Sequence, residues 1–216
     1  MQASTRNVRT AEQVREALRH GELHKTAFAM GCFWGPDSRF GAMSGVVQTR
    51  VGYGGGRQPD PDYRSVGDHA ETVRVIFDPS AIAFDTLLEE FRTWHTPSRG
   101  GGQYRAAIFP SDDAQRASVQ AYLDALPDPS FALQVSLPGT EEALFWDAEA
   151  YHQKHRLRAS PAVVAALEAE FGPRWDESSV ATKLNGVEGK ELRPDAWLAC
   201  LSERAQAAYH TARAQV

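Results

Sequence analysis

The chain has 216 residues, of which 42% are hydrophobic and 24% charged, and its formal net charge is −5. This length allows one generous domain or one domain with a helical appendage, and the acidic balance gives no reason to expect nucleic acid or an anionic membrane as a partner. No apolar stretch approaches a membrane span, and residues 1–9 lack the apolar core of a secretory signal. The two cysteines, Cys32 and Cys200, are far apart and have no zinc-type spacing. We therefore expect no metal site, no disulfide scaffold and a reducing, cytoplasmic compartment.

Local signals predict mixed strands and helices in the first two thirds of the chain. Residues 10–13 match the capping box that opens a helix, which should end near Gly21. Ser111 is expected to cap a helix that runs to about Leu126. Hydrophobic periodicity predicts further helices at 36–43 and 84–94, strands at 26–31, 45–51, 70–77, 104–109 and 131–137, and Gly-rich loops at 52–68 and 95–102. Loops of such length in a compact domain are often functional.

The remaining residues favour helices. Residues 141–157 are interpreted as a loop followed by a helix, and Ala-rich patterns at 161–171 and 194–214 predict two helices separated by a polar connector at 172–193. We therefore expect an α+β fold, a two-layer, ferredoxin-like sandwich with helices packed on a small mixed sheet. The expected organisation is an N-terminal helical arm (1–24), a catalytic domain (25–158) and a helical C-terminal extension packed on the core (159–216).

Cys32 lies where a short buried strand is expected to turn into a helix. Pro36 suits the first turn of a helix and Asp37 suits its N-terminus. The sulfur should then lie beside unpaired backbone N–H groups, which stabilise a thiolate and lower the thiol pKa. Glycines on both sides leave room for close approach, and Phe33 and Trp34 supply two aromatic faces. The pattern favours a nucleophilic cysteine in an aromatic pocket over a buried structural cysteine.

Three further residues are candidates to converge on Cys32. Glu71 begins a predicted strand after a long loop, Tyr63 lies within that loop, and Tyr104 begins another predicted strand. A carboxyl in an aromatic pocket has a raised pKa and can keep a proton to donate, and two phenol hydroxyls can bind a polar oxygen. Taken singly, each of these residues is more often a surface or packing residue.

Short motifs in order connect these residues. Gly31-Cys32-Phe33-Trp34-Gly35 resembles the signature of the A-type peptide-methionine sulfoxide reductases. The similarity covers about residues 25–157 and continues through Gly52-Tyr53-Gly54-Gly55-Gly56, Pro61-Asp62-Tyr63, His69-Ala70-Glu71, His95-x-Pro97, Gln103-Tyr104-Arg105 and Ala148-Glu149-x-Tyr151-His152-Gln153. Several motifs in one order are far more specific than a single motif.

The resemblance implies a reaction and a role for each candidate. It implies Cys32 as nucleophile, Glu71 as proton donor, Tyr63 and Tyr104 as oxygen-binding phenols, and Phe33 and Trp34 as the methyl pocket. The thiolate would attack the sulfur of methionine S-sulfoxide, free or in a protein, and become a sulfenic acid as methionine leaves. A second thiol would form a disulfide with it, and an external reductant such as thioredoxin or a small thiol would reset the enzyme with no bound cofactor.

Some features depart from the family pattern. The loop between Tyr63 and Glu71 is shorter than usual. The next Gly-rich loop is shortened too and lacks the family's aspartate, which leaves Arg99 as the nearest charged residue. Asp37 replaces a usual glutamate, and Ala150 replaces a usual acidic residue. The loss of the loop aspartate favours a changed substrate or a protein that binds oxidised methionine without turnover.

Cys200 is the only other thiol, and no Gly-rich tail with resolving cysteines is present. It lies on a predicted helix with Trp197 and Leu201, so burial as a packing residue and a resolving role both stay open. A disulfide needs Cα atoms within about 7 Å. Resolution by Cys200 would therefore require a movement of the C-terminal segment, for which the polar connector with Gly186 and Gly189 offers length. The rival hypothesis is resolution by an external small thiol.

Two functions compete with the reductase. A cysteine hydrolase or acyl transferase needs a histidine base at Cys32, and His69 or His152 are the candidates, although no sequence feature places either there. A sensing protein on the same fold would bind methionine sulfoxide without reducing it. The intact set of Cys32, Glu71 and Tyr104 favours the reductase.

Overall fold

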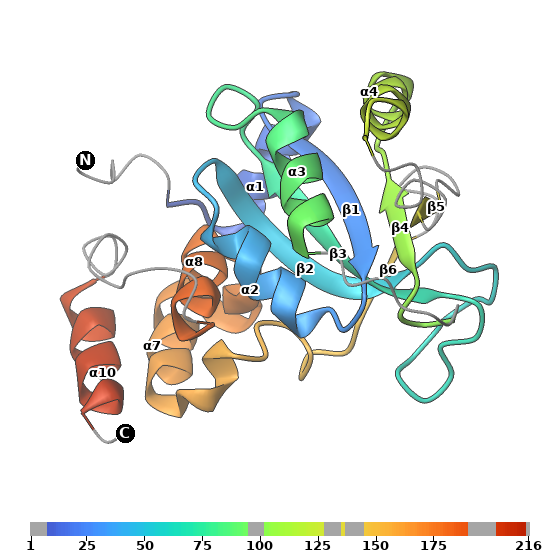
Figure 1. Ribbon diagram of the computed structural model, residues 1–216. Coiled ribbons are helices and arrows are strands. Elements are labelled where there is room, and N and C mark those ends of the chain that lie inside the picture. Colours follow the sequence, from blue (N-terminus) through green and yellow to red (C-terminus); the bar gives the residue numbers. More distant parts are fainter. Residues whose placement is uncertain (1–7, 95–101, 128–134, 137–144, 190–201, 215–216) are drawn as a thin grey trace.

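The computed structural model describes residues 8–94, 102–127, 135–136, 145–189 and 202–214. Its centre is a sheet with the strand order β5-β4-β1-β3-β2-β6 (Figure 1). The strands are β1 (His24–Met30), β2 (Val46–Gly54), β3 (Ala70–Phe77), β4 (Ala106–Phe109), β5 (Val135–Ser136) and β6 (Phe145–Asp147). Neighbouring strands are antiparallel except β4 and β5, which are parallel. The sheet is therefore mixed, as predicted.

The four central strands carry the ferredoxin-like topology. Along the chain, β1, α2 (Trp34–Ala42), β2, β3, α3 (Phe84–Trp94) and β4 follow one another, and in the sheet β4 and β3 flank β1 while β2 lies outside β3. This β-α-β-β-α-β arrangement places both crossover helices on one face, where Figure 1 shows them. The predicted α+β sandwich is confirmed.

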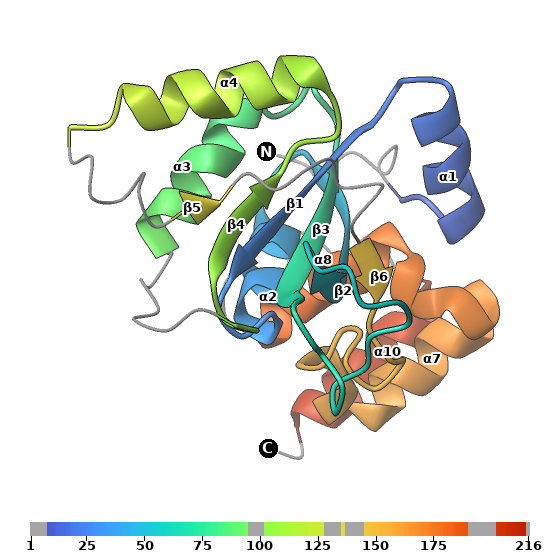
Figure 2. The same ribbon diagram turned by 90° about the vertical axis from the view of Figure 1, so that its right-hand side faces the viewer.

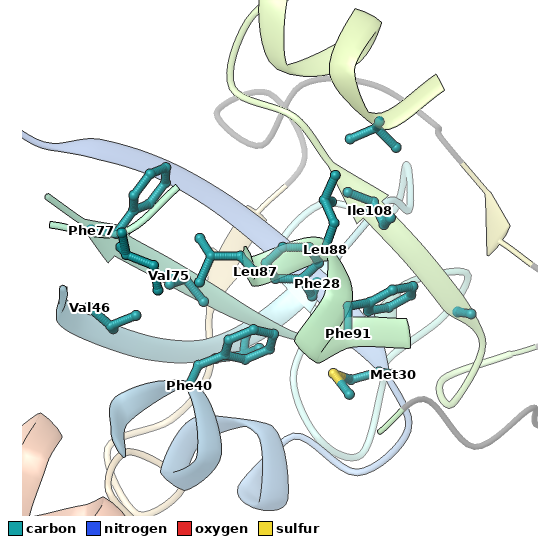
Figure 3. Close-up of a cluster of buried hydrophobic side chains, with 14 of the residues drawn as sticks. Phe28, Met30, Phe40, Val46, Val75, Phe77, Leu87, Leu88, Phe91 and Ile108 are labelled. Carbon is teal, nitrogen blue, oxygen red and sulfur yellow. The ribbon is translucent and has the colours of Figure 1, made fainter. Parts of the chain in front are cut away.

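Strand periodicity explains how both faces of the sheet are covered. On β3, Val75 and Phe77 point into the main core with α2, α3 and α4 (Asp113–Asp124), whereas Ile76 points to the other face. There it packs against Val14 of α1 (Ala11–Arg19), which lies across the sheet from α3 (Figure 2). The main core is rich in aromatic rings: Phe28 stacks on Phe40 with ring centroids 4.9 Å apart (Figure 3).

Most predicted elements are present, with shifted ends. The capping box at Thr10 is formed, and β3 and α3 have the predicted bounds. Helix α4 is capped by Asp112 rather than Ser111, because the Asp112 carboxylate accepts the N–H of Gln115. Helix α2 begins at Trp34, two residues before Pro36. The missing N–H of Pro36 costs nothing there, because the first turn of a helix has no intrahelical acceptors for its N–H groups.

The segment after β6 differs from its prediction. Residues 150–156 form turns and η2 (Leu157–Ala159) is a short 3₁₀ helix, so the helix expected within 141–157 is wrong for the residues described there. Helix α7 (Pro161–Phe171) is confirmed. The polar connector at 172–193 is also wrong, because η3 (Gly172–Glu177) and α8 (Ser179–Glu188) occupy it. Helix α10 (Glu203–Arg213) packs on α7.

Helix α8 is buried against α2 through small residues (Figure 1). A Cβ on Gly41 would lie 2.8 Å from the Thr182 carbonyl oxygen, and a Cβ on Gly186 would lie 3.0 Å from the Ser38 carbonyl oxygen. The absence of side chains lets the two backbones approach, and the pairing of late α2 with early α8 shows that the helices run in opposite directions. The division into arm, catalytic domain and extension (1–24, 25–158 and 159–216) stays a prediction.

Candidate active site

Cys32 follows β1 and precedes α2, so the predicted strand-to-helix turn is confirmed. Gly31 adopts a φ of 92°, which favours glycine. Cys32 is exposed and has a free thiol, and the N–H of Trp34 donates to its sulfur, which lowers the thiol pKa. Desolvation and the nearby Glu71 carboxyl outweigh this donor and raise the pKa of Cys32. The expected lowering of the thiol pKa is therefore wrong.

Glu71 lies buried on β3 with 2% of its surface exposed. Its Oε2 atom accepts the N–H of Phe33 at 3.0 Å, and its Oε1 atom accepts the side-chain amide of Gln103 at 2.9 Å. The carboxyl lies close enough to Cys32 for each group to affect the pKa of the other. Burial raises the pKa of Glu71 more than these donors lower it. The predicted direction is confirmed, and the carboxyl is suited to carry a proton beside the sulfur.

Tyr63 and Tyr104 meet at the mouth of the site. The two phenols lie close enough for Tyr63 to affect the pKa of Tyr104, and both side chains are largely exposed, at 44% and 42% of their surfaces. Partial burial, followed by the charges of Glu71, Tyr63 and Cys32, raises the pKa of Tyr104, so this phenol keeps its proton. Tyr104 lies in the turn before β4 and not within the strand. The structure thus brings both phenols to the side of Cys32 and Glu71.

Aromatic rings surround the first turn of α2. Phe33 is buried, and its ring centroid is 5.1 Å from that of His152. The indole N–H of Trp34 donates to Nδ1 of His152 at 3.2 Å. One face of Trp34 is covered by the ring of His155, which stacks on it at 3.7 Å with an interplanar angle of 5°. Trp34 therefore presents its remaining surface and its edge to any ligand above Cys32.

Sequence reasoning gave no role to several residues that assemble this site. The Tyr53 hydroxyl donates to Glu149 Oε2 at 2.8 Å, and the backbone N–H of Tyr63 donates to Glu149 Oε1 at 3.0 Å. Gln153 bonds the backbone N–H and carbonyl of Val51 through its side chain. These contacts tie residues 148–153 to β2 and to the loop of Tyr63. The sequence motif that ends in Gln153 marks this segment, but it does not show which residues Glu149 and Gln153 contact.

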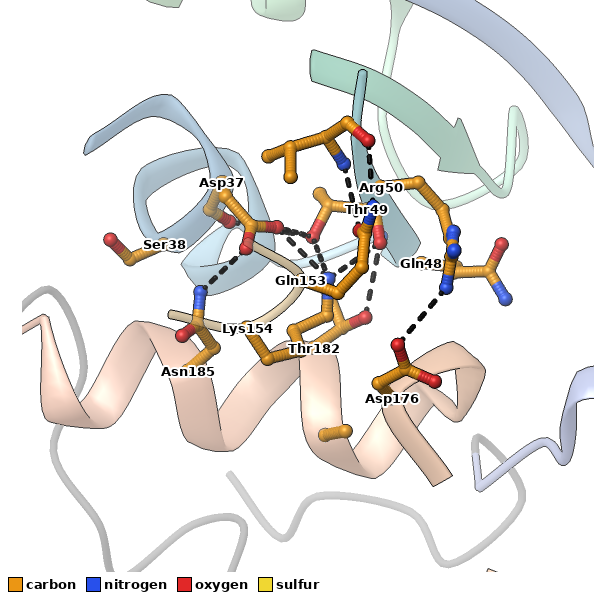
Figure 4. Close-up of polar contacts among 12 residues, drawn as sticks. Asp37, Ser38, Gln48, Thr49, Arg50, Gln153, Lys154, Asp176, Thr182 and Asn185 are labelled. Carbon is orange, nitrogen blue, oxygen red and sulfur yellow. Dashed lines mark hydrogen bonds and ion pairs between the residues drawn. The ribbon is translucent and has the colours of Figure 1, made fainter. Parts of the chain in front are cut away.

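A second polar network lies on the other side of α2 (Figure 4). Asp37, expected at the helix N-terminus, is fully buried and forms a 2.9 Å ion pair with Lys154. Its Oδ1 atom also accepts from the Thr49 hydroxyl at 2.5 Å, and its Oδ2 atom accepts from the Asn185 amide at 3.0 Å. This carboxylate joins α2, β2, the turn at Lys154 and α8.

Comparison with known proteins identifies the family. The family model described as peptide methionine sulfoxide reductase matches residues 24–179. The chain belongs to this family. The match includes all of the candidate site described above and extends beyond the similarity seen in the motifs, to the first residue of α8.

Relatives of this peptide methionine sulfoxide reductase family resemble the chain over most of its length. Peptide methionine sulfoxide reductase A5 of Arabidopsis thaliana is 35% identical over 183 residues, which is 80% of this chain and 70% of the relative. A peptide methionine sulfoxide reductase of Drosophila melanogaster is 37% identical and covers 74% of this chain and 65% of its own length. The solved methionine sulfoxide reductase A of Corynebacterium diphtheriae has a TM-score of 0.51 at 28% identity, over 65% of this chain and 76% of that structure.

No observation supports the hydrolase alternative. Both ring nitrogens of His69 are used within its own loop, at 3.1 Å from the Gly56 nitrogen and 2.8 Å from the Gln58 carbonyl oxygen. His152 accepts from Trp34 through Nδ1, and its buried Nε2 has no hydrogen-bond partner among the described atoms. Within the described ranges, neither histidine bonds the Cys32 sulfur in the way a base must.

Other sequence expectations concern sites outside these contacts. Cys200, Trp197, Leu201 and Arg99 lie outside the described residues. Among the residues that are described, no group of three or more His, Cys, Asp or Glu side chains could hold a metal ion. None of the described helices is both long and apolar enough to cross a membrane.

Proposed function

We propose that this chain reduces methionine S-sulfoxide, free or within a protein, to methionine and that Cys32 is the nucleophile. The observation that carries the proposal is the position of the buried Glu71 carboxyl, which accepts the N–H of Phe33, the residue that follows the exposed Cys32 thiol. Since burial raises the pKa of both groups, the pair starts the reaction with protons available and needs no separate base. Membership of the family supports this reaction class.

The reaction is balanced by these side chains alone. The Cys32 sulfur attacks the sulfoxide sulfur, while Glu71 gives a proton to the sulfoxide oxygen. This attack forms a bond between the two sulfur atoms. That bond and the sulfur–oxygen bond of the substrate then break as the hydroxyl transfers to the Cys32 sulfur, so methionine leaves and Cys32 becomes a sulfenic acid. The substrate sulfur gains two electrons and the Cys32 sulfur loses two. The thiol gives its proton to the Glu71 carboxylate, so Glu71 ends the step protonated again.

Two groups of aromatic residues orient the substrate in this proposal. The Tyr63 and Tyr104 hydroxyls donate to the sulfoxide oxygen, since both phenols lie exposed beside Cys32 and Glu71. Phe33 and the uncovered surface of Trp34 contact the methyl group. The aromatic side must fit an apolar group and the phenol side a polar one, so the two epimers of the sulfoxide are distinguished.

The central test uses a single turnover. Cys32→Ser should release no methionine from methionine sulfoxide, because a serine hydroxyl at neutral pH is neither ionised nor soft enough to attack sulfur. Cys200→Ser, the matched control, should release about one equivalent of methionine without reductant and show one added oxygen on the Cys32 peptide by mass spectrometry. Methionine release by Cys32→Ser would refute the proposal.

For recycling, we propose that Cys200 attacks the sulfenic acid, releases water and forms a disulfide that a cytoplasmic dithiol such as thioredoxin reduces. Helix α8 runs back along α2 and ends beside Ser38 at Gly189. The eleven residues from there to Cys200 span at most about 36–40 Å when extended. The Ser202 hydroxyl contacts Glu170 at 2.7 Å on α7.

Peptide mapping without reductant tests the recycling step. After one turnover, a Cys32–Cys200 linked peptide supports resolution by Cys200. Absence of that peptide, together with unchanged turnover of Cys200→Ser with thioredoxin, would refute it and leave an external thiol as the resolving group. Absence of the linked peptide would leave the role of Cys32 as the nucleophile unaffected, whereas its presence requires that Cys32 was oxidised in the turnover.

A further inference from the structure

The ring of His152 lies between the two sides of the proposed substrate pocket. It is buried, with 2% of its surface exposed. On the side proposed for the methyl group, its centroid is 5.1 Å from that of Phe33 and 5.7 Å from that of Trp34. On the side proposed for the oxygen, its centroid is 5.0 Å from that of Tyr63. A change in this ring therefore reaches both sides of the pocket.

The hydrogen bond between Trp34 and His152 determines which imidazole nitrogen carries the proton. An indole N–H can only donate, so Nδ1 of His152, which is 3.2 Å away, must be the unprotonated nitrogen. The neutral ring then carries its proton on Nε2. This nitrogen has no hydrogen-bond partner among the described atoms, and its distance of 3.9 Å from Oε2 of Glu149 is too long for a hydrogen bond. Within the described residues, the imidazole is therefore hydrogen-bonded through Trp34.

The residues that follow His152 fix its position. Gln153 bonds the backbone of β2 through its side chain, and Lys154 forms its buried ion pair with Asp37. Trp34, by contrast, is the first residue of α2, and its side chain is only partly buried. His152 is thus the anchored partner of the bond, and the indole of Trp34 is the group that the bond orients.

Protonation of His152 would remove this bond, because the second proton must go to Nδ1 and two N–H donors cannot bond each other. Glu149, Tyr151 and His155 face the ring from its own segment, Tyr63 faces it from its loop, and the start of α2 faces it with the two aromatic rings named above. Burial lowers the pKa of His152, the Glu149 carboxylate opposes this, and His155 adds to it. The ring is therefore neutral at pH 7 and takes up a proton only below its ordinary pKa of 6.5.

We infer that His152 is a positioning residue for the reaction: in its neutral form it holds the Trp34 indole beside Cys32, and its protonation releases the indole. The purpose of this device rests on the proposed function, in which Trp34 contacts the methyl group of the substrate. The bond itself, and its loss on protonation, require no turnover. Acid would then favour the proton donor Glu71 but disfavour orientation of the substrate, so reduction should weaken once His152 takes up its proton.

The NMR resonance of the Trp34 indole N–H reports this bond directly. The chain has five tryptophans, and a Trp34→Phe variant identifies the resonance. As the pH of wild type falls from about 7.5 to about 5, the range in which a histidine titrates, the resonance should move upfield. His152→Asn places a carbonyl oxygen close to the position of Nδ1, since both atoms are bonded to the γ carbon, and it does not titrate. Its resonance should lose most of this movement and stay downfield, whereas His152→Leu, which has no acceptor, should be upfield throughout.

His155→Phe is the matched control. It keeps a ring on the face of Trp34 but removes the other histidine that titrates there. The movement of the resonance with pH should persist in this variant. A wild-type resonance that stays in place, the same movement in His152→Asn, or its loss in His155→Phe would overturn the inference. If the variants at His152 fail to fold, the titrations of wild type and His155→Phe still decide between these outcomes.

The effect on the reaction is measured separately, in single turnovers at neutral pH and low sulfoxide concentration. His152→Leu should slow methionine release by about two- to tenfold, the range expected for the loss of one neutral hydrogen bond, and His152→Asn should restore most of the rate. Equal rates for His152→Leu and wild type would overturn the positioning role. The resonance requires no reductase activity, so failure of the proposed function and failure of this inference give different results.

Discussion

Two buried carboxyl groups, Asp37 on α2 and Glu71 on β3, have different surroundings. Asp37 and Glu71 are 0% and 2% exposed. Asp37 faces the ammonium of Lys154 and the amide of Asn185. Among the described residues, the hydrogen-bond donors to Glu71 are uncharged: the backbone N–H of Phe33 and the side-chain amide of Gln103. The contacts of Asp37 hold separate parts of the fold together, whereas burial without a cation raises the pKa of Glu71, so that this carboxyl can keep its proton for chemistry.

The largest expected effect is a loss of stability when the ion pair between Asp37 and Lys154 is broken. Asp37→Asn leaves the buried Lys154 ammonium without its counter-charge and should lower the free energy of unfolding by about 3–5 kcal/mol. Urea unfolding at neutral pH measures this loss. Asp60→Asn, an exposed loop substitution at a φ of 50° that asparagine tolerates, is the control and should change little. A loss below about 1 kcal/mol for Asp37→Asn would show that Asp37 does not hold the fold together, which contradicts the comparison with Glu71.

On the chemical side, Glu71→Gln should slow methionine release in a single turnover by roughly two orders of magnitude or more, since glutamine cannot donate the proton. Glu149→Gln is the matched control. It replaces another carboxyl of the site that holds Tyr53 and Tyr63 but has no bond to the thiol. Equal losses in both variants would show that the arrangement of the aromatic residues, and not proton donation, limits the rate.

A smaller effect is expected from the donor to Glu71. Gln103→Met removes the amide that stabilises the ionised carboxyl at 2.9 Å, so the pKa of Glu71 should rise further. A hydrogen bond to a charged group contributes about 1.5–3 kcal/mol. The basic limb of the pH profile of single-turnover methionine release should therefore move to higher pH. A limb that stays in place, or moves to lower pH, would contradict the role of this carboxyl as the acid.

The smallest effect concerns stability. The folded-state pKa of Glu71 is raised above its ordinary value of 4.5 by burial, so its stabilising contribution is complete below pH 4.5 and is lost as pH rises through the folded pKa. Glu71→Gln carries no charge and escapes this loss. Relative to wild type, the variant should gain stability as pH rises above about 4.5, as measured by urea midpoints. If wild type instead becomes more stable relative to Glu71→Gln as pH rises, burial does not raise the pKa of Glu71.

Sequence patterns predicted the helices and strands in which apolar residues recur with the helical or strand period. Strand β3 and helix α3 have this property. Helix α8 was missed because its buried residues include Thr182, Lys183 and Asn185, whose polar groups bond to distant parts of the chain. Strand β6 is only three residues long and exists through its pairing with β2. The local sequence therefore contains no pattern that predicts either α8 or β6.

For the candidate site, too, local features were predicted and features that depend on distant residues were not. The turn at Cys32 and the raised pKa of Glu71 were predicted, because glycine spacing and an aromatic environment are local or motif-borne features. The direction of the Cys32 pKa was not, since the opposing desolvation and the Glu71 carboxyl come from the folded surroundings. The stacking of His155 on Trp34 and the hydrogen bond from Trp34 to His152 likewise depend on how residues 145–159 return to α2.

The network at Asp37 also has a consequence for biosynthesis. Lys154 and Asn185 follow Asp37 by 117 and 148 residues. At a synthesis rate of about 5–20 residues per second, the second partner emerges roughly 7–30 s after the aspartate. Throughout that interval, the helix that begins just after the nucleophile contains a carboxylate without its final partners and cannot settle into its buried position. On the ribosome, the early-made reactive cysteine is therefore among the last parts of the molecule to become functional.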